Sequence, residues 1–292
     1  MGGGAPVTEP TPRRAAVLGH PIAHSLSPVL HRAAYRALGL DGWRYDAVDV
    51  TEEALAPFLA SLDDTWAGLS LTMPLKQTVL PLLHHVEPLA QVVGAVNTVL
   101  LQGSGAGRVL VGANTDVHGV VAALREGLAG APVATAAVLG AGATASSAVA
   151  ALAELGAHEP VVFARSLSRT GGLARATHRM GVHPTFRRLE HAAGALRVFD
   201  VVVSTLPPGA ADPFAEAWAA GEGPAAGRGV LLDVAYDPRR SALAVAWERA
   251  GGVAVDGERM LLHQAVEQVR LMTGRVGPLA AMDAALQERL GA

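Results

Sequence analysis

The sequence has no cysteine, few aromatic residues and few charged ones. The lack of cysteine excludes disulfides, thiolate metal sites and a cysteine nucleophile, and it fits a reducing cytoplasm, the compartment we expect. Charged residues make up 17% of the chain and the formal net charge is −3. Nucleic acids and acidic membranes require a basic surface, so we expect neither as a partner.

Lysine is also nearly absent, because Lys76 is the single lysine among 23 basic residues. An arginine stays protonated, whereas an ammonium group can exchange its proton once its surroundings lower its pKa. Lys76 follows the apolar run 68–72, and ligands of α/β sheets bind just beyond the carboxyl ends of strands. The pattern is consistent with a lysine that moves a proton, and equally with a surface lysine.

What is present is typical of a large α/β protein. The 292 residues are half apolar and predict two domains. Short β-rich runs alternate with helical patterns, which indicates parallel, doubly wound sheets. We expect strands at 15–18, 43–49, 68–72, 96–101, 109–112, 136–139, 161–163, 201–204, 230–233 and 253–255. We expect helices at 28–38, 52–62, 116–128, 143–155, 242–250, 257–273 and 278–290.

Three further segments complete this outline. The Gly/Pro-rich residues 1–12 are interpreted as a flexible tail, and 102–108 as a hairpin turn. The uncharged stretch 133–153 is long enough to span a membrane, but it is dominated by small residues. A strand, glycine turn and helix explain it better.

That glycine turn carries a dinucleotide-binding signature. Residues 138–145 read Val-Leu-Gly-Ala-Gly-Ala-Thr-Ala, between an expected strand and an expected helix. Gly140 provides the tight turn, and Gly142 lets backbone N–H groups approach a pyrophosphate at the helix N-terminus. We therefore expect Gly140, Ala141, Gly142, Ala143, Thr144 and Ala145 to bind the cofactor. Thr205 and Gly257 are further cofactor-binding candidates outside this turn.

The next strand indicates which nicotinamide cofactor is used. An NAD site usually has an acidic residue at that strand end to bind the ribose 2′-OH. Here residues 164–169 read Ala-Arg-Ser-Leu-Ser-Arg, with no acid. Arg165, Ser166 and Arg169 can instead bind a 2′-phosphate through charge-assisted hydrogen bonds. The sequence therefore favours NADP(H), although surface arginines at a helix start would look the same.

Two further polar clusters stand at the starts of expected helices. In Asn114-Thr115-Asp116 the first two residues can cap a helix, while Asp116 either favours its first turn or pairs with Lys76 as a proton relay. Ser27 and Pro28 form a typical helix start, and Ser25 and Ser27 also suit a carboxylate ligand.

Histidines are not expected to hold a metal. His20 and His24 have no acidic residue near them in the sequence, so we predict no metal site there. His84 and His85 read as an exposed loop pair.

Taken together, these segments resemble the shikimate dehydrogenase family from about Arg14 to Gly274. The resemblance rests on the blocks 19–28 (GHPIAHSLSP), 71–76 (LTMPLK), 94–98 (GAVNT), 114–116 (NTD), the glycine turn and 257–265 (GERMLLHQA). Their order and spacing are highly specific. The resemblance implies NADPH-dependent reduction of 3-dehydroshikimate to shikimate.

The resemblance also implies a role for individual residues. Lys76 and Asp116 would be the catalytic pair. Ser25, Ser27 and Tyr236 would surround the substrate carboxylate, and the ring hydroxyls would be held by Thr72, Asn97, Asp116 and Gln264. The fold class would be α/β, with an open, mostly parallel substrate domain (13–115 plus 257–292), a Rossmann-type NADP domain (116–256) and a cleft between them. The partners would be small molecules, for a monomer or homodimer.

Three positions depart from the family pattern, and three other functions remain open. Ser70 replaces an Asn, Ala164 replaces the Asn before the cofactor arginine, and Met272 replaces a bulky aromatic residue. The alternatives are a quinate/shikimate or aminoshikimate dehydrogenase, a non-catalytic NADP sensor, and a tetrahydrofolate dehydrogenase. The last explains neither the paired serines nor Gln264.

Overall fold

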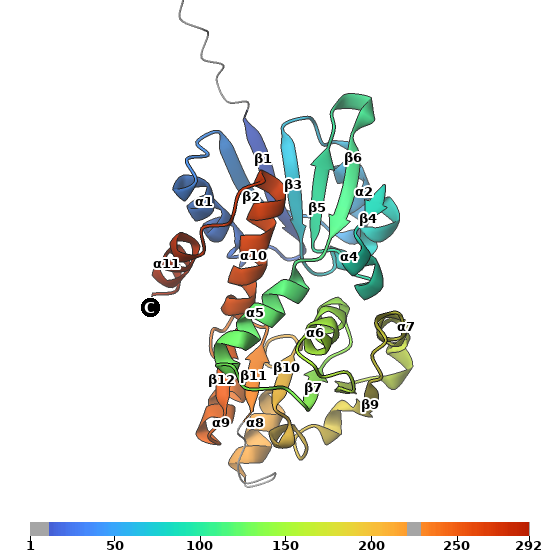
Figure 1. Ribbon diagram of the computed structural model, residues 1–292, viewed down its shortest axis with the longest axis vertical. Helices are drawn as coiled ribbons and strands as arrows, with labels where there is room; N and C mark the ends of the chain where they lie inside the picture. The colour runs from blue at the N-terminus through green and yellow to red at the C-terminus, as the bar shows by residue number, and fades with distance from the viewer. Residues whose placement is uncertain (1–11, 221–228, 292) are drawn as a thin grey trace, which may run out of the picture.

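A computed structural model describes residues 12–220 and 229–291. The predicted flexible tail lies outside these residues except for Pro12. The described chain forms two six-stranded sheets, one above the other in Figure 1, with a helix-lined boundary between them. This is the expected α/β architecture of two open sheets.

The first sheet is mixed and has the strand order β2-β1-β3-β5-β6-β4. Strands β1, β2 and β3 are parallel, whereas β5 runs antiparallel to both β3 and β6. The turn at 102–108 joins β5 to β6, and these two antiparallel strands form the predicted hairpin. The bounds are β1 (Arg13–Gly19), β2 (Trp43–Asp49), β3 (Trp66–Leu71), β4 (His85–Val86), β5 (Thr98–Gln102) and β6 (Val109–Ala113).

The second sheet is entirely parallel, with the order β12-β11-β10-β7-β8-β9. Its chain order reverses between β7 and β10, as in a Rossmann sheet, and ligands bind at such a switch point. The bounds are β7 (Ala136–Leu139), β8 (Val161–Ala164), β9 (Thr185–Arg188), β10 (Val201–Ser204), β11 (Val230–Asp233) and β12 (Val253–Asp256).

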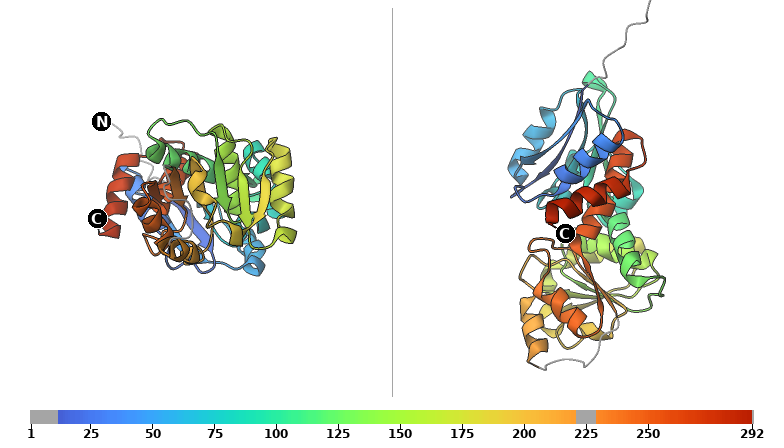
Figure 2. Two further views of the ribbon diagram at one scale, coloured as in Figure 1. Left: turned by 90° about the horizontal axis from the view of Figure 1, so that it is seen from below. Right: turned by 90° about the vertical axis from the view of Figure 1, so that its left-hand side faces the viewer.

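Helices cover both sheets. Their bounds are α1 (Ser27–Ala37), α2 (Glu52–Ala60), α3 (Leu75–Thr78), α4 (Pro88–Val93), α5 (Asp116–Leu128), α6 (Ala143–Glu154), α7 (Gly171–Met180), α8 (Asp212–Ala219), α9 (Ala242–Arg249), α10 (Gly257–Thr273) and α11 (Leu279–Leu290). Helix α11 packs against α1, so the end of the chain returns to the first sheet (Figure 2).

Apolar runs explain why the central strands form where the sequence predicts them. All four residues of β7, β10 and β11 are buried, which is typical of parallel strands covered on both faces. The sequence did not predict β4, β9, α3, α4, α7 or α8. His84 and His85 are both exposed and His84 lies in a loop, as predicted, but His85 begins β4 and pairs with Val111.

Helices α5 and α10 lie side by side where the two sheets meet (Figure 1). Their close approach depends on Gly119, because a Cβ atom there would lie 2.8 Å from the carbonyl oxygen of Met260 and 2.9 Å from Cβ of Gln264. Any larger residue would push the helices apart. The contact therefore fixes the start of α10 against the start of α5, and both helices bring polar residues to the boundary.

Candidate functional site

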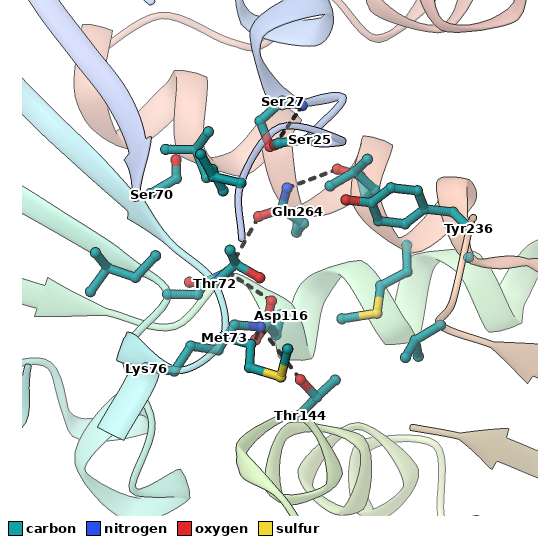
Figure 3. A pocket seen from close by; sticks show the side chains of 18 of the residues that line it. Ser25, Ser27, Ser70, Thr72, Met73, Lys76, Asp116, Thr144, Tyr236 and Gln264 are labelled. Atoms are coloured by element: carbon teal, nitrogen blue, oxygen red, sulfur yellow. Dashed lines mark hydrogen bonds and ion pairs between the residues drawn. The ribbon is translucent and has the colours of Figure 1, made fainter. Parts of the chain in front are cut away.

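A cavity of about 260 Å³ lies between the two sheets. Its walls come from the ends of β1 and β3, from the starts of α1, α5 and α6, from the loop after β11 and from α10 (Figure 3). Every predicted substrate residue lines it: Ser25, Ser27, Thr72, Asn97, Asp116, Tyr236 and Gln264. The predicted catalytic Lys76 lines it as well.

Lys76 and Asp116 form an ion pair in this cavity. Nζ of Lys76 lies 2.7 Å from Oδ2 of Asp116, and their side chains are 13% and 4% exposed. Nζ also lies 3.5 Å from the hydroxyl of Thr144 at the start of α6. Removing one partner of such a shielded pair leaves a poorly solvated charge, so the two side chains hold each other in place.

Asn97 fixes the other oxygen of Asp116. Its Nδ2 donates to Oδ1 of Asp116 at 2.8 Å, while its Oδ1 accepts the backbone N–H of Thr115 at 2.8 Å. The backbone N–H sets which way the amide points, because only an oxygen can accept it. Both carboxylate oxygens of Asp116 are therefore engaged, and the carboxylate lies at the N-terminus of α5, where negative charge is favoured.

The paired serines lie at the start of α1. The helix begins at Ser27, where the sequence predicts a helix start, but Leu26 is the cap residue and no side chain caps the helix. The hydroxyl of Ser25 instead accepts the backbone N–H of Ser27 at 3.3 Å. The side chain of Ser27 is buried, lines the cavity and lies within hydrogen-bonding reach of Tyr45.

Tyr236 closes the cavity from the second sheet. Burial, and to a lesser degree the neighbouring Asp237, raises the pKa of its phenol, so it is a hydrogen-bond donor at neutral pH. At the mouth, Nδ1 of His24 lies 3.7 Å from a carboxylate oxygen of Asp237. These contacts join the loop before α1 to the loop after β11.

Gln264 faces the cavity from α10. Its Nε2 donates to the backbone oxygen of Leu261 at 2.9 Å, and its Oε1 lies 3.3 Å from Nδ2 of Asn97. Asn97 is therefore the hub that links the α10 wall to the ion pair. Thr72 follows β3 directly, on the opposite wall.

A second cavity, of about 270 Å³, adjoins the first. It is lined by the start of α6 with Gly142, Ala143, Thr144 and Ala145, by Thr205 after β10, and by the segment 72–77. Thr72, Met73, Lys76 and Thr144 line both cavities. Lys76 thus stands at the junction of the two spaces.

The glycine turn has the geometry that a pyrophosphate requires. Gly140 has φ +109°, and a Cβ atom there would lie 2.4 Å from the hydroxyl oxygen of Thr205. A Cβ on Gly142 would meet nothing within 4 Å, so open space lies above the backbone at the helix start. Ala141 packs against the apolar core instead of lining the cavity. This cradle fits the phosphates of a dinucleotide.

The end of β8 carries the charge that the sequence predicts. Arg165 and Arg169 are not buried, and among the residues that the structure describes no carboxylate lies within ion-pair distance of either. The hydroxyls of Ser166 and Ser168 lie 2.9 Å apart between them. Two guanidinium groups and no acid at this strand end fit an NADP 2′-phosphate better than a free ribose hydroxyl.

The last predicted cofactor residue, Gly257, begins α10 and lines the first cavity, with the predicted substrate residues. A Cβ atom there would lie 2.5 Å from the backbone oxygen of Val234, so glycine allows α10 to start against the loop after β11. Within residues 12–220 and 229–291, no three His, Cys, Asp or Glu side chains gather as a metal site. His20 does have an acidic neighbour in space, Asp49, with 2.7 Å between Nδ1 and Oδ1.

Several residues of the cavity wall were not predicted from the sequence. Gln268 lies one helical turn after Gln264 on α10 and lines the cavity, and that four-residue spacing is a signal that could have found it. Met73, Val234 and Met260 are apolar lining residues without a distinguishing pattern. In the described part of the chain, no helix is both long and apolar enough to cross a membrane.

Known proteins share this arrangement. The family model for the shikimate dehydrogenase substrate binding domain matches residues 17–99, and that for the shikimate 5'-dehydrogenase C-terminal domain matches residues 257–287. A shikimate dehydrogenase (NADP(+)) from Citrifermentans bemidjiense is 39% identical over 283 residues, covering 94% of this chain and 95% of that protein.

Solved structures agree with the sequence relatives. Shikimate dehydrogenase from Mycobacterium tuberculosis is 38% identical, with a TM-score of 0.82 over 95% of this chain and 100% of that one. Shikimate 5-dehydrogenase from Thermus thermophilus, solved in complex with NADP(H) and shikimate, is 34% identical, with a TM-score of 0.78 over 94% of this chain and 99% of that one.

Proposed function

The chain belongs to the shikimate dehydrogenase family, and we propose that Lys76 and Asp116 are the catalytic pair of its reaction. That reaction is the reversible, NADPH-dependent reduction of 3-dehydroshikimate to shikimate, a step of chorismate and aromatic amino-acid biosynthesis. One observation carries the proposal above all. The ion pair, with 2.7 Å between Nζ and Oδ2, stands where the substrate cavity meets the cofactor cavity.

The chemistry divides between cofactor and protein. NADPH, when bound, supplies the hydride. As hydride reaches C3 of the substrate, negative charge grows on the C3 oxygen, and the ammonium group of Lys76 stabilises it and gives it a proton. Asp116 orients Lys76 and accepts a hydrogen bond from the neighbouring C4 hydroxyl. The side chain of Lys76 is only 13% exposed, so water competes little for this contact.

The remaining cavity residues position the ring. Ser25 and Ser27, with the phenol of Tyr236 opposite, bind the substrate carboxylate. Thr72, Asn97 and Gln264 bind ring hydroxyls. Gly140, Gly142 and Thr144 cradle the cofactor phosphates, while Arg165 and Arg169 bind its 2′-phosphate. The accessible guanidinium groups and the open space above Gly142 support these assignments.

The domain division follows the two sheets. We assign residues 13–115 plus 257–292 to a discontinuous substrate domain and 116–256 to the cofactor domain. Contacts of α10 with β3 and β5, and of α11 with α1, support placing the last two helices with the first sheet. A cytoplasmic location and a monomer or homodimer without nucleic-acid or membrane partners remain our expectation.

An absorbance assay at the NADPH band tests the function. Shikimate with NADP is one arm, and quinate with NAD, shikimate with NAD and quinate with NADP are the others. The proposal expects rapid reduction only with shikimate and NADP. Turnover of quinate with NAD at a comparable kcat/KM would favour a quinate dehydrogenase, and tight NADPH binding without turnover in any arm would favour a sensor.

A further inference from the structure

A chain of buried polar groups stands behind the substrate cavity and ends at Ser70. Its members are His31, Tyr45, Ser70, Thr98 and Gln268, each at most 3% exposed. Two of them, Ser70 and Gln268, line the cavity itself. The catalytic pair does not use any of these side chains, and so many buried polar groups need a reason beyond packing.

Gln268 is the centre of this chain, and its orientation is fixed. One terminal atom of its side-chain amide lies 3.2 Å from the backbone oxygen of Asn97 and 3.0 Å from the hydroxyl of Thr98. A backbone oxygen can only accept a hydrogen bond, so this atom must be the donor Nε2. Oε1 therefore faces Ser70, at 2.8 Å, and Nε2 of His31, at 3.2 Å.

This orientation dictates where each proton lies. Because Oε1 of Gln268 can only accept, the hydroxyl of Ser70 must donate to it. Ser70 has no second proton, so the hydroxyl of Tyr45, 2.6 Å away, must donate to Ser70. The Ser70 oxygen then has one lone pair left, with which it can accept a hydrogen bond from a ligand in the cavity.

His31 is the second hydrogen-bond partner of Oε1 of Gln268. It is fully buried and its ring stacks on Tyr45 with 3.9 Å between centroids. Burial lowers the pKa of His31 to about 3, so the ring is neutral at physiological pH. Its single proton is on Nε2, because that nitrogen faces Oε1 of Gln268.

We infer that Gln268, Tyr45 and His31 are positioning residues that hold the Ser70 hydroxyl as a hydrogen-bond acceptor only. This wall of the cavity then selects a ring hydroxyl, which can donate, and rejects a carbonyl, which cannot. The inference rests on the proposed substrate. The consequence is a fixed orientation of the substrate ring. The ketone of 3-dehydroshikimate accepts a hydrogen bond from Lys76 and cannot bind at Ser70, which offers no proton.

Elimination identifies the hydroxyl that Ser70 binds. The proposed function places the carboxylate at Ser25 and Ser27, and the C3 and C4 oxygens at Lys76 and Asp116. The C5 hydroxyl is the ring hydroxyl left for the remaining wall, where Ser70 supplies an acceptor beside Thr72, Asn97 and Gln264. Ser70 lines the cavity and lies away from the ion pair in Figure 3, so it faces a part of the ring other than C3 and C4 in this assignment.

The experiment compares two analogues of shikimate that differ only at C5. In one, hydrogen replaces the C5 hydroxyl, and in the other fluorine does, which can accept but not donate. For the wild-type enzyme we expect kcat/KM to fall about 10- to 100-fold with either, since an acceptor is left unpaired. The fluoro analogue should be the poorer, because its fluorine faces a lone pair.

Gln268→Met reverses this order, because the freed proton of Ser70 can then point at fluorine. The fluoro-to-deoxy ratio of kcat/KM should rise from below one to above one. Tyr45→Phe is the matched control, since it removes a hydroxyl of the same network but leaves the Ser70 proton on Gln268, so the ratio should stay below one. An unchanged ratio in Gln268→Met would overturn the inference.

A second variant keeps the test decisive if Gln268→Met does not fold. Ser70→Ala should bring shikimate and its deoxy analogue to within about threefold of each other in kcat/KM, since the group that discriminates between them is gone. Undiminished discrimination in that variant would also contradict the inference. Wild-type enzyme that fails to oxidise shikimate at all would instead refute the proposed function.

Discussion

At the residue scale, the site depends on charged and polar groups that the fold takes out of water. Asp116 has both oxygens occupied, by Lys76 and by Asn97. The residues alone left the pairing of Lys76 with Asp116 as one of two alternatives, and the family resemblance selected it. The sequence could not predict the network of His31, Tyr45 and Gln268, because the three come from separate elements and only packing brings their polar atoms together.

His31 makes a residue-scale prediction about acid stability. Burial lowers its pKa from 6.5 to about 3, so only the unfolded chain takes up a proton between these values. The contribution of His31 to the free energy of unfolding is therefore greatest above pH 6.5. Below that pH it falls by about 1.4 kcal/mol per pH unit. We expect a loss of about 2 kcal/mol between pH 6.5 and pH 5.

Urea unfolding at pH 7, 6 and 5 measures this loss. The matched variant is His31→Asn, which keeps a donor to Gln268 but does not titrate. Its free energy of unfolding should change less over the same range than that of the wild type. Equal pH dependence in the two proteins would show that His31 is not the titrating group.

At the element scale, the central strands of the second sheet were the most predictable. Strands β7, β10 and β11 have the expected bounds because each is a continuous apolar run. Strand β4 has two residues, and β9 reads Thr-Phe-Arg-Arg with little burial, so neither has a strand pattern. Helix α7 begins with two glycines, which disfavour a helix, and its contacts with α6 and α4 stabilise it.

The segment from the end of β8 to α7 makes an element-scale prediction about the cofactor. Arg165→Ala should raise the KM for NADP about 10- to 100-fold, the effect of losing a charge-assisted hydrogen bond, and leave the KM for NAD nearly unchanged. Arg175→Ala, an exposed arginine on α7, is the control and should change neither. Equal losses for NADP and NAD in Arg165→Ala would contradict a 2′-phosphate site.

At the scale of the whole molecule, the packing of α5 against α10 and a few polar contacts join the halves. Arg179 on α7 donates to the backbone oxygen of Val92 at 3.0 Å, and Lys76 reaches Thr144 at 3.5 Å. His24 and Asp237 meet at the mouth, where both are exposed. Because the contacts across the mouth are small while α5 and α10 are tightly packed, we expect any hinge closure of the cleft to pivot about that helix pair.

Small-angle X-ray scattering tests this closure. Adding NADP and shikimate together should reduce the radius of gyration, because ligands that touch both halves stabilise the closed form. Arg179→Ala should enlarge the radius of the ligand-free protein, since it removes a contact across the boundary. Superimposable profiles with and without ligands would argue that the halves are held rigidly.

The most direct test of the proposed catalytic pair is the turnover of Lys76→Ala. The kcat should fall by about two to four orders of magnitude, the scale of a lost general acid, while the KM for shikimate changes little. Cofactor binding, followed by NADPH fluorescence, should persist, because the glycine turn and Arg165 are untouched. A Lys76→Ala enzyme with near wild-type kcat would contradict the central role given to this lysine.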